Sequence, residues 1–352
     1  MNTKAKKIVC GFDNLYKAMN KCKIGVAWKK PVARYANNGI VSVHKTRKEL
    51  LTDKRKIRPY NIFTIHEPKK REIVSTHFED RIVQTSISDN YLYDKLTRNF
   101  VYDNHACQIG KGTDLARERL KTHMQRYFRK HGLNGYVLNI DFKDYFGSTR
   151  HDIAKESVRK NVDDEWVLMN IDMIVDSFNH GDDPNVGMGL GSPITQLIQL
   201  ALPNTIDHLI KEKLKIKTFL RYMDDNIFIH HSKNYLIYCL NFIREKLEPL
   251  GIALNTTKTQ IYKLIQGIKF LGFTFKLTET GKVLMLLNKN NIRRRKRKIK
   301  KHKELLDRGK MTEEQVEQSF EGWKAHAEKG NNYHIIQKMT RYYRRVMLCS
   351  EN

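Results

Sequence analysis

The sequence that decides the fold is FLRYMDDNIFI, residues 219–229. Two adjacent carboxylates, Asp224 and Asp225, separate two short runs of aromatic and aliphatic residues, and this pattern predicts a β-hairpin with the carboxylates at its tip. Like charges this close repel each other, and a bound divalent metal is the usual reason that a fold keeps them together. An ordinary polar turn is the alternative, and the dipeptide alone favours it.

A third carboxylate ends an apolar run upstream. Residues 135–142 read GYVLNIDF, which predicts a buried strand with Asp141 at its carboxyl end. A strand-end carboxylate and a carboxylate pair on a hairpin are what a two-metal phosphoryl-transfer site requires, with two ions roughly 3.5–4 Å apart. Mg²⁺ needs few protein groups, so these Asp side chains and substrate phosphates suffice, and Mn²⁺ accepts similar ligands.

The composition indicates a polyanionic partner. The chain has 352 residues, 40% of them hydrophobic, which is enough for a sizeable core, and its formal net charge is +27. A charge this positive favours nucleic acid, and 16 Tyr and 15 Phe that could stack on bases favour it over a membrane surface.

Cysteine usage and hydropathy indicate the cellular compartment of the protein. The five cysteines have no zinc-ligand spacing and their number is odd, which predicts a reduced, intracellular protein. No apolar signal core follows Met1, and no run approaches the ~20 apolar residues of a membrane span. We therefore expect a cytoplasmic protein with no membrane partner.

Two basic segments each have two interpretations. Residues 62–74 predict a hairpin whose tip carries Lys69, Lys70 and Arg71, either as a solvated turn or as groups that reach a triphosphate. Residues 293–301 form the second basic segment. Basic runs are often disordered tails, but a capping box at Thr312 and Gln315 and further apolar residues follow this one. We therefore predict that residues 288–352 form a basic helical domain along a nucleic-acid backbone. Its proposed contacts are Arg293, Arg294, Arg295, Lys296, Arg297 and Lys298.

A glycine-rich loop at residues 187–191 precedes a long predicted helix. Pro193 suits the first turn of that helix, and Pro203 is predicted to kink it before it ends near Lys213.

These motifs, followed by Lys258 and by FLGF at residues 270–273, stand in the order found in reverse transcriptases. The chain resembles that family over residues 57–290 and more weakly beyond. The resemblance implies an α+β right-hand polymerase, with fingers and a palm in which an antiparallel sheet packs on helices, and a C-terminal helical thumb. The implied boundaries are a basic N-terminal extension over 1–56, fingers with part of the palm over 57–135, palm over 136–287 and basic helical thumb over 288–352.

The resemblance also implies roles for the residues of the predicted metal site. Asp141, Asp224 and Asp225 match the metal-binding catalytic carboxylates, and the backbone of Phe142 would lie beside the second metal. Phe146 matches the steric gate that excludes a 2′-hydroxyl, although core packing is the alternative. Lys258 matches a lysine that protonates pyrophosphate, which requires hydrogen-bond reach.

Substrate positions follow from the same resemblance. Lys69, Lys70 and Arg71 match the positions that hold the incoming deoxynucleoside triphosphate. The primer grip, which would hold the primer or growing cDNA on the template RNA, is matched by Phe270, Leu271, Gly272 and Phe273.

One departure from the family pattern is informative. Most reverse transcriptases read Gln-Gly-x-x-x-Ser-Pro where this chain has LGSPITQ at residues 190–196. An aliphatic residue before the glycine and a final Gln resemble the enzymes of diversity-generating retroelements, in the bacterial branch related to group II introns. This implies that Leu190, Gly191 and Gln196 border the nucleotide, that synthesis is error-prone at template adenines, and that a small basic accessory protein is a partner.

Other interpretations remain open at this stage. A group II intron-like or phage-defence reverse transcriptase would carry the same motifs. An RNA-binding protein that kept the fold without catalysis is opposed by the intact Asp141, Asp224 and Asp225. A metal-dependent nuclease is opposed by the lack of a further His/Asp/Glu cluster.

Overall fold

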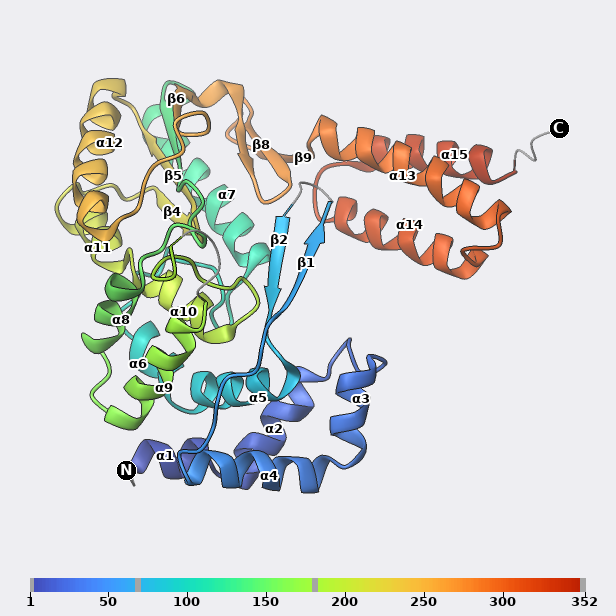
Figure 1. The fold of residues 1–352 in the computed structure, drawn as a ribbon. Helices are drawn as coiled ribbons and strands as arrows, with labels where there is room; N and C mark the ends of the chain where they lie inside the picture. Colours follow the sequence, from blue (N-terminus) through green and yellow to red (C-terminus); the bar gives the residue numbers. More distant parts are fainter. Residues whose placement is uncertain (1–2, 67–70, 179–182, 349–352) are drawn as a thin grey trace.

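The computed structural model describes residues 3–66, 71–178 and 183–348. Helices and antiparallel sheets build an α+β fold, which confirms the predicted fold class (Figure 1). In the described part of the chain, no helix combines the length and the apolar character needed to cross a membrane.

A four-stranded antiparallel sheet with the order β4-β5-β3-β6 forms the centre of the molecule. Its strands are β3 (Tyr136–Asp141), β4 (Phe219–Tyr222), β5 (Asp225–His230) and β6 (Gln260–Lys263). Both predicted strand regions are confirmed, since β3 ends at Asp141 and β4 and β5 form the hairpin.

The strands β3 and β5 are buried on both faces, and each face packs on different helices. Val137, Ile227 and Ile229 belong to a core with helix α7 (Thr113–His131) and the C-terminal part of the chain. Leu138 and Phe228 point the other way, into a core with helices α11 (Asn204–Glu212) and α12 (Lys233–Leu247). Because side chains alternate along a strand, these two cores fix the register of the sheet.

The helices that pack on the sheet near Leu138 and Phe228 begin and end at identifiable residues. Helix α12 (Lys233–Leu247) begins at Ser232, whose hydroxyl accepts a hydrogen bond from the Tyr235 amide. The predicted long helix is interrupted at Pro203, which separates α10 (Pro193–Ala201) from α11 (Asn204–Glu212). Proline cannot donate the helix hydrogen bond, which explains the break.

Residues 4–51 are mostly helical and share one hydrophobic core with helices within residues 78–97 and 151–201. Helix α2 packs on α4 and α5, and α1 packs on α9. The elements of this part are α1 (Lys4–Val9), α2 (Phe12–Cys22), α3 (Lys30–Asn37), α4 (Gly39–Leu51), α5 (Phe78–Ile87), η1 (Ser88–Leu92), α6 (Tyr93–Thr97), α8 (His151–Arg159) and α9 (Glu165–Asp176).

The predicted basic hairpin consists of β1 (Asn61–Ile65) and β2 (Arg71–Ser75), with Ile65 opposite Arg71. All five residues of β1 are exposed, and the hairpin rises from the N-terminal helices toward the C-terminal arm (Figure 1). Lys69 and Lys70 lie outside the described residues.

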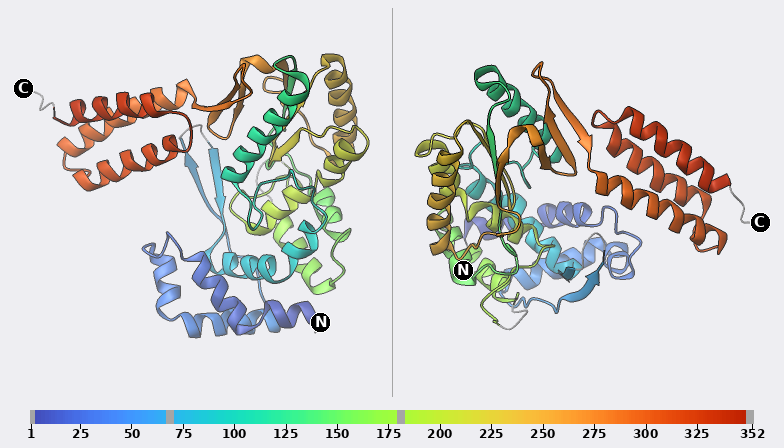
Figure 2. Two further views of the ribbon diagram at one scale, coloured as in Figure 1. Left: turned by 180° about the vertical axis from the view of Figure 1, so that it is seen from behind. Right: turned by 90° about the horizontal axis from the view of Figure 1, so that it is seen from above.

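The C-terminal part begins with a third antiparallel sheet, formed by β7 (Ile268–Phe270), β8 (Phe273–Leu277) and β9 (Val283–Leu287). Three helices follow and project from the rest of the molecule as an arm (Figure 2): α13 (Lys289–Asp307), α14 (Glu313–Glu328) and α15 (Tyr333–Leu348). The capping box at Thr312 and Gln315 is present at the start of α14, as predicted. The remaining elements are two short 3₁₀ turns, η2 (Glu248–Leu250) and η3 (Leu264–Gln266).

A buried ion pair holds the β4–β5 hairpin onto the helices. The Arg221 side chain is fully buried, and its Nη2 lies 2.6 Å from Oδ2 of Asp207 on α11. The same nitrogen donates to the carbonyl of Leu200, and Nη1 donates to the carbonyl of Met223 in the turn. The guanidinium therefore joins the turn that precedes Asp225 to both α10 and α11.

We expect Asp207→Ala to destabilise the protein by about 3–5 kcal/mol, because it leaves the Arg221 charge buried without its carboxylate partner. The matched control is Asp152→Ala, which breaks the exposed Arg150–Asp152 pair and should cost at most about 1 kcal/mol. Urea unfolding of both variants measures the difference. Equal losses in the two variants would show that the buried pair does not anchor the hairpin.

Candidate active site

The sheet register sets two of the predicted carboxylates side by side. Asp141 at the end of β3 pairs with Asp225 at the start of β5, and Asp225 also pairs with Tyr222 across the hairpin. Asp224 lies in the two-residue turn between these strands. The tip of the hairpin is thus shifted by one residue from the prediction, since Met223 and Asp224 form the turn and Asp225 is already part of a strand.

The turn has a strained backbone. Met223 has φ of +54°, in the left-handed region that non-glycine residues rarely adopt. Side chains on both sides hold it there, because Arg221 Nη1 donates to the Met223 carbonyl and Asn226 Nδ2 donates to the Asp224 carbonyl at 3.0 Å. Strain of this kind is maintained only where the surroundings impose it, and it is common at functional sites.

The three carboxylates repel one another. Desolvation, followed by the charges of Asp224 and Asp141, raises the pKa of Asp225 to about 6, and Lys258 opposes this rise. The Asp225 side chain still reaches solvent, which screens each of these effects. The cluster therefore favours binding of a cation or a proton.

Asp141 is buried and its two oxygens have different surroundings. Oδ2 lies 2.5 Å from Nζ of Lys258, which is half-exposed. Oδ1 is buried and has no hydrogen-bond partner among the described residues. A buried carboxylate oxygen without a partner is costly, so this atom is available for a ligand.

The residues fit a divalent cation only in part. In the described ranges, no group of three or more His, Cys, Asp or Glu side chains is arranged to hold a metal ion. However, Asp141 Oδ1 is free to accept a cation, and Asp225 faces it across the sheet with a raised pKa. Carboxylates of this kind, completed by phosphate oxygens of a substrate, are a set that Mg²⁺ accepts.

The segment after Asp141 is joined to the glycine-rich loop by hydrogen bonds. The Met188 amide donates to the Phe146 carbonyl at 2.8 Å, and the Tyr145 hydroxyl donates to the carbonyl of Gln199 on α10 at 2.6 Å. Phe146 itself is half-buried between two hydrophobic cores, so it is partly a packing residue. Phe142 is buried, and its backbone forms a bridge with Leu254.

Leu190 and Gly191 lie on the exposed side of this loop. Leu190 is 36% exposed, and a Cβ on Gly191 would have as its nearest atom a guanidinium nitrogen of Arg81 at 3.8 Å. The Gln196 amide donates to the Leu190 carbonyl at 3.2 Å and accepts from the Cys107 thiol at 3.7 Å. Arg81 and Cys107 were missed by sequence reasoning, since nothing local distinguishes them.

The predicted primer grip is the turn between β7 and β8. Leu271 and Gly272 both have positive φ. This is the backbone conformation of a two-residue hairpin turn whose twist matches that of the flanking strands. Phe270 meets Tyr222 edge-to-face at 6.4 Å, so this turn lies beside the carboxylate hairpin. Arg117 of α7 donates to the Leu271 carbonyl at 2.9 Å and was also missed in the sequence.

The basic run on α13 is not uniformly exposed. Arg293, Arg294, Lys296, Arg297 and Lys298 are exposed. Arg295 contradicts the prediction, because it is 7% exposed, donates to Ser319 Oγ on α14 and lies over the Phe320 ring. Its stem and charge pack between helices, so it is not a surface contact for RNA.

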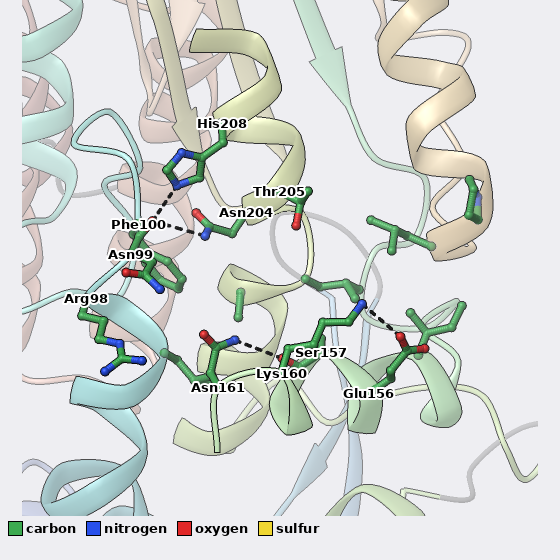
Figure 3. Close-up of a pocket in the computed structure, with 16 residues that line it drawn as sticks. Arg98, Asn99, Phe100, Glu156, Ser157, Lys160, Asn161, Asn204, Thr205 and His208 are labelled. Carbon is green, nitrogen blue, oxygen red and sulfur yellow. Dashed lines mark hydrogen bonds and ion pairs between the residues drawn. The ribbon is translucent and has the colours of Figure 1, made fainter. Parts of the chain in front are cut away.

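One cavity lies away from these carboxylates. It has a volume of about 900 Å³ and is enclosed by residues from the loop after α6, from α8 and from the start of α11 (Figure 3). His208 contacts the Asn99 carbonyl and Glu212, and these hydrogen bonds raise the pKa of His208. No Asp lines the cavity, so it is separate from the predicted metal site.

We expect Asp225→Asn to stabilise the protein in EDTA at pH 7.5 by at most about 1 kcal/mol after solvent screening. Because the pKa of Asp225 is higher in the folded protein than its ordinary value, the folded state loses stability as pH rises from about 4 to about 6. The variant lacks this loss, so its advantage should shrink at pH 5. Thermal unfolding at both pH values measures it, with the exposed Asp94→Asn as control. An advantage that does not change with pH would contradict the electrostatic origin.

Comparison with known protein families identifies one family for this chain. The sequence matches the family model "Reverse transcriptase (RNA-dependent DNA polymerase)" over residues 65–275, more than half of the chain. This range includes the carboxylates, the glycine-rich loop and the turn between β7 and β8. No protein of curated function matches the sequence.

Solved structures similar to this chain include two telomerases. One is apo telomerase from Candida tropicalis truncated from its C-terminal domain, with 15% identity, a TM-score of 0.47 and coverage of 68% of this chain and 59% of that chain. The other is telomerase from Candida albicans in complex with a TWJ fragment of telomeric RNA, with 10% identity, a TM-score of 0.47 and coverage of 72% and 52%. This chain therefore spans little more than half the length of either telomerase. On the strength of the family match, the chain belongs to the reverse transcriptase family.

Proposed function

We propose that this protein is an RNA-directed DNA polymerase that copies a template RNA into cDNA. In this reaction the primer 3′-hydroxyl attacks the α-phosphorus of a deoxynucleoside triphosphate and pyrophosphate leaves. The observation that carries the proposal is the pairing of Asp141 with Asp225 inside the region that matches the family. We assign the fingers with part of the palm to residues 57–135, the palm to 136–287 and the thumb to 288–352, after a basic extension over 1–56.

Asp141, Asp224 and Asp225, with the Phe142 backbone nearby, would hold two Mg²⁺ or Mn²⁺ ions. Bound ions of this kind stabilise the charge that develops on the attacking and leaving oxygens. The protein's own contribution is to keep these carboxylates ionised and close together in spite of their repulsion. The buried Arg221–Asp207 pair below the turn and Lys258 beside Asp141 supply that restraint.

Lys258 has two successive roles in this proposal. Its ammonium pairs with Asp141 Oδ2 and neutralises part of the negative charge at the site. When Asp141 takes other ligands, Lys258 is free to donate a proton to the departing pyrophosphate, which it can do only within hydrogen-bond reach.

The remaining predicted residues border the substrates. Phe146 would exclude a 2′-hydroxyl, and Leu190, Gly191 and Gln196 would line the nucleotide and the templating base. The tip of the β1–β2 hairpin, with Lys69, Lys70 and Arg71, would hold the triphosphate. The turn over residues 270–273 would position the primer end, because Phe270 adjoins Tyr222 next to the carboxylates.

Primer extension tests the function. We expect wild-type protein with Mg²⁺ and deoxynucleotides to extend a primer on an RNA template, and Asp224→Asn/Asp225→Asn to lose at least about 10³-fold in rate, since it removes charge stabilisation in the transition state. Asp94→Asn/Asp144→Asn, which removes two exposed carboxylates, is the matched control. Undiminished extension by the Asp224/Asp225 variant would refute the assignment of these residues.

We further propose that the enzyme is part of a diversity-generating retroelement, works with a small basic accessory protein and misincorporates at template adenines. Leu190 supports this proposal. Its side chain has no donor or acceptor and is exposed on the loop, and its backbone carbonyl accepts a hydrogen bond from Gln196. A glutamine there could hydrogen-bond to the nucleotide or the templating base, and Leu190 cannot.

Leu190→Gln should reduce misincorporation at template adenines by up to about tenfold, the equivalent of one hydrogen bond worth about 0.5–1.5 kcal/mol. Sequencing of extension products gives the error rate at each template base. Leu190→Met keeps an apolar side chain of similar size and should keep the wild-type error rate. Equal fidelity in all three proteins would count against the retroelement assignment.

A further inference from the structure

The three-stranded sheet β7-β8-β9 has one buried and one exposed face. Phe273 and Phe275 point inward to the core shared with α7, whereas Thr274 and Lys276 point outward. Lys269 pairs with Thr274 and therefore shares the outward face. Phe270, which contacts Tyr222, lies on the opposite, buried face of the sheet.

A groove of about 810 Å³ runs between this outward face and the start of α13. Figure 1 shows the two elements meeting at the base of the C-terminal arm. Six of the residues that line the groove are cationic: Lys269, Lys276, Lys289, Arg293, Arg294 and Arg297. No carboxylate lines it.

The cations of the groove are not neutralised by the protein. All six side chains are exposed, and among the described residues none of these side chains forms an ion pair or a hydrogen bond. Inside the groove, Thr274 Oγ1 donates a hydrogen bond to Asn288 Oδ1 at 2.5 Å, so this contact involves none of the cations. Six positive charges around one hollow repel one another, and this arrangement lowers its energy by binding an extended polyanion.

We propose that this groove binds the phosphate backbone of an RNA segment that lies outside the primer–template duplex. The proposal rests on the function proposed above, which brings RNA to the protein. Because the sheet separates the groove from the carboxylate hairpin, a backbone held here belongs to a different stretch of nucleic acid from the one being copied. Contacts to phosphates fix position without reading sequence, so the groove would retain or guide the RNA before or after it is copied.

The test compares two RNA–DNA hybrids by fluorescence anisotropy. One hybrid ends flush at the primer–template duplex, and the other carries a long single-stranded RNA extension, placed at either template end in turn. The groove variant is Lys269→Gln/Lys276→Gln/Lys289→Gln. The matched control is Lys300→Gln/Lys301→Gln/Lys310→Gln, which removes the same charge from exposed positions toward the other end of α13 and just beyond it.

We expect the groove variant to bind the extended hybrid about tenfold more weakly than wild type, with a salt slope shallower by about 2, or roughly 0.7 for each lost contact. Its affinity for the flush hybrid, and the control variant's affinity for both hybrids, should match wild type. Equal loss on both hybrids would place the groove in the duplex path, and no loss on either would leave no role for it, so each result would overturn the proposal. Extension of the flush hybrid is measured separately, so that a failed polymerase assay is distinguished from a failed groove.

Discussion

The antiparallel register of β3 and β5 is the constraint on which the site depends, because it fixes Asp141 opposite Asp225. A slip by one residue would turn every side chain of a strand to the other face. Such a slip is prevented by the apolar residues between the carboxylates and the far ends of the strands, where Val137 and Ile229 enter one core and Leu138 and Phe228 the other. Burial of hydrocarbon, worth about 25 cal/mol per Å², thus holds together charges that would otherwise separate.

The electrostatic cost of that arrangement is met from two sides. From the exposed side, Lys258 reaches Asp141, and its partial exposure means that it can leave when a stronger cation arrives. From the buried side, Arg221 is fixed by Asp207 and in turn holds the carbonyl of the strained Met223. The first contact is exchangeable and the second is not, which is the combination required of a site whose ligands change during a reaction and whose frame does not.

Local patterns were enough to predict the main elements. The hairpin over residues 219–229, the strand that ends at Asp141 and the capping box at Thr312 each depend on a few neighbouring residues, and the structure contains all three. The kink expected at Pro203 is instead a break between two helices. The grouping of Asp141 with the hairpin also followed from strand-end chemistry, although the exact pairing did not.

Contacts between distant segments could not be predicted in the same way. Arg117 donates a hydrogen bond to a turn 154 residues later in the chain, and no sequence spacing predicts this contact. Two misses had a detectable signal. Arg221 interrupts an apolar strand, and a charged side chain at such a position usually has a buried partner. Arg295 is separated by four and seven residues from Ile299 and His302, which are also buried, so helical periodicity would have assigned it to the inner face of α13.

The distribution of partners explains where the excess positive charge is found. Several of the chain's carboxylates are used internally: Asp80 binds Arg55, Asp103 binds Arg119 and Lys211, and Asp207 binds Arg221. Cations near these acids are neutralised within the fold, and the cations that line the outward face of β7-β8-β9 are left without acids. A net charge of +27 opposes compaction through self-repulsion. A polyanion that binds only the folded protein removes part of that repulsion, so a nucleic acid bound as proposed should also contribute to the stability of this fold.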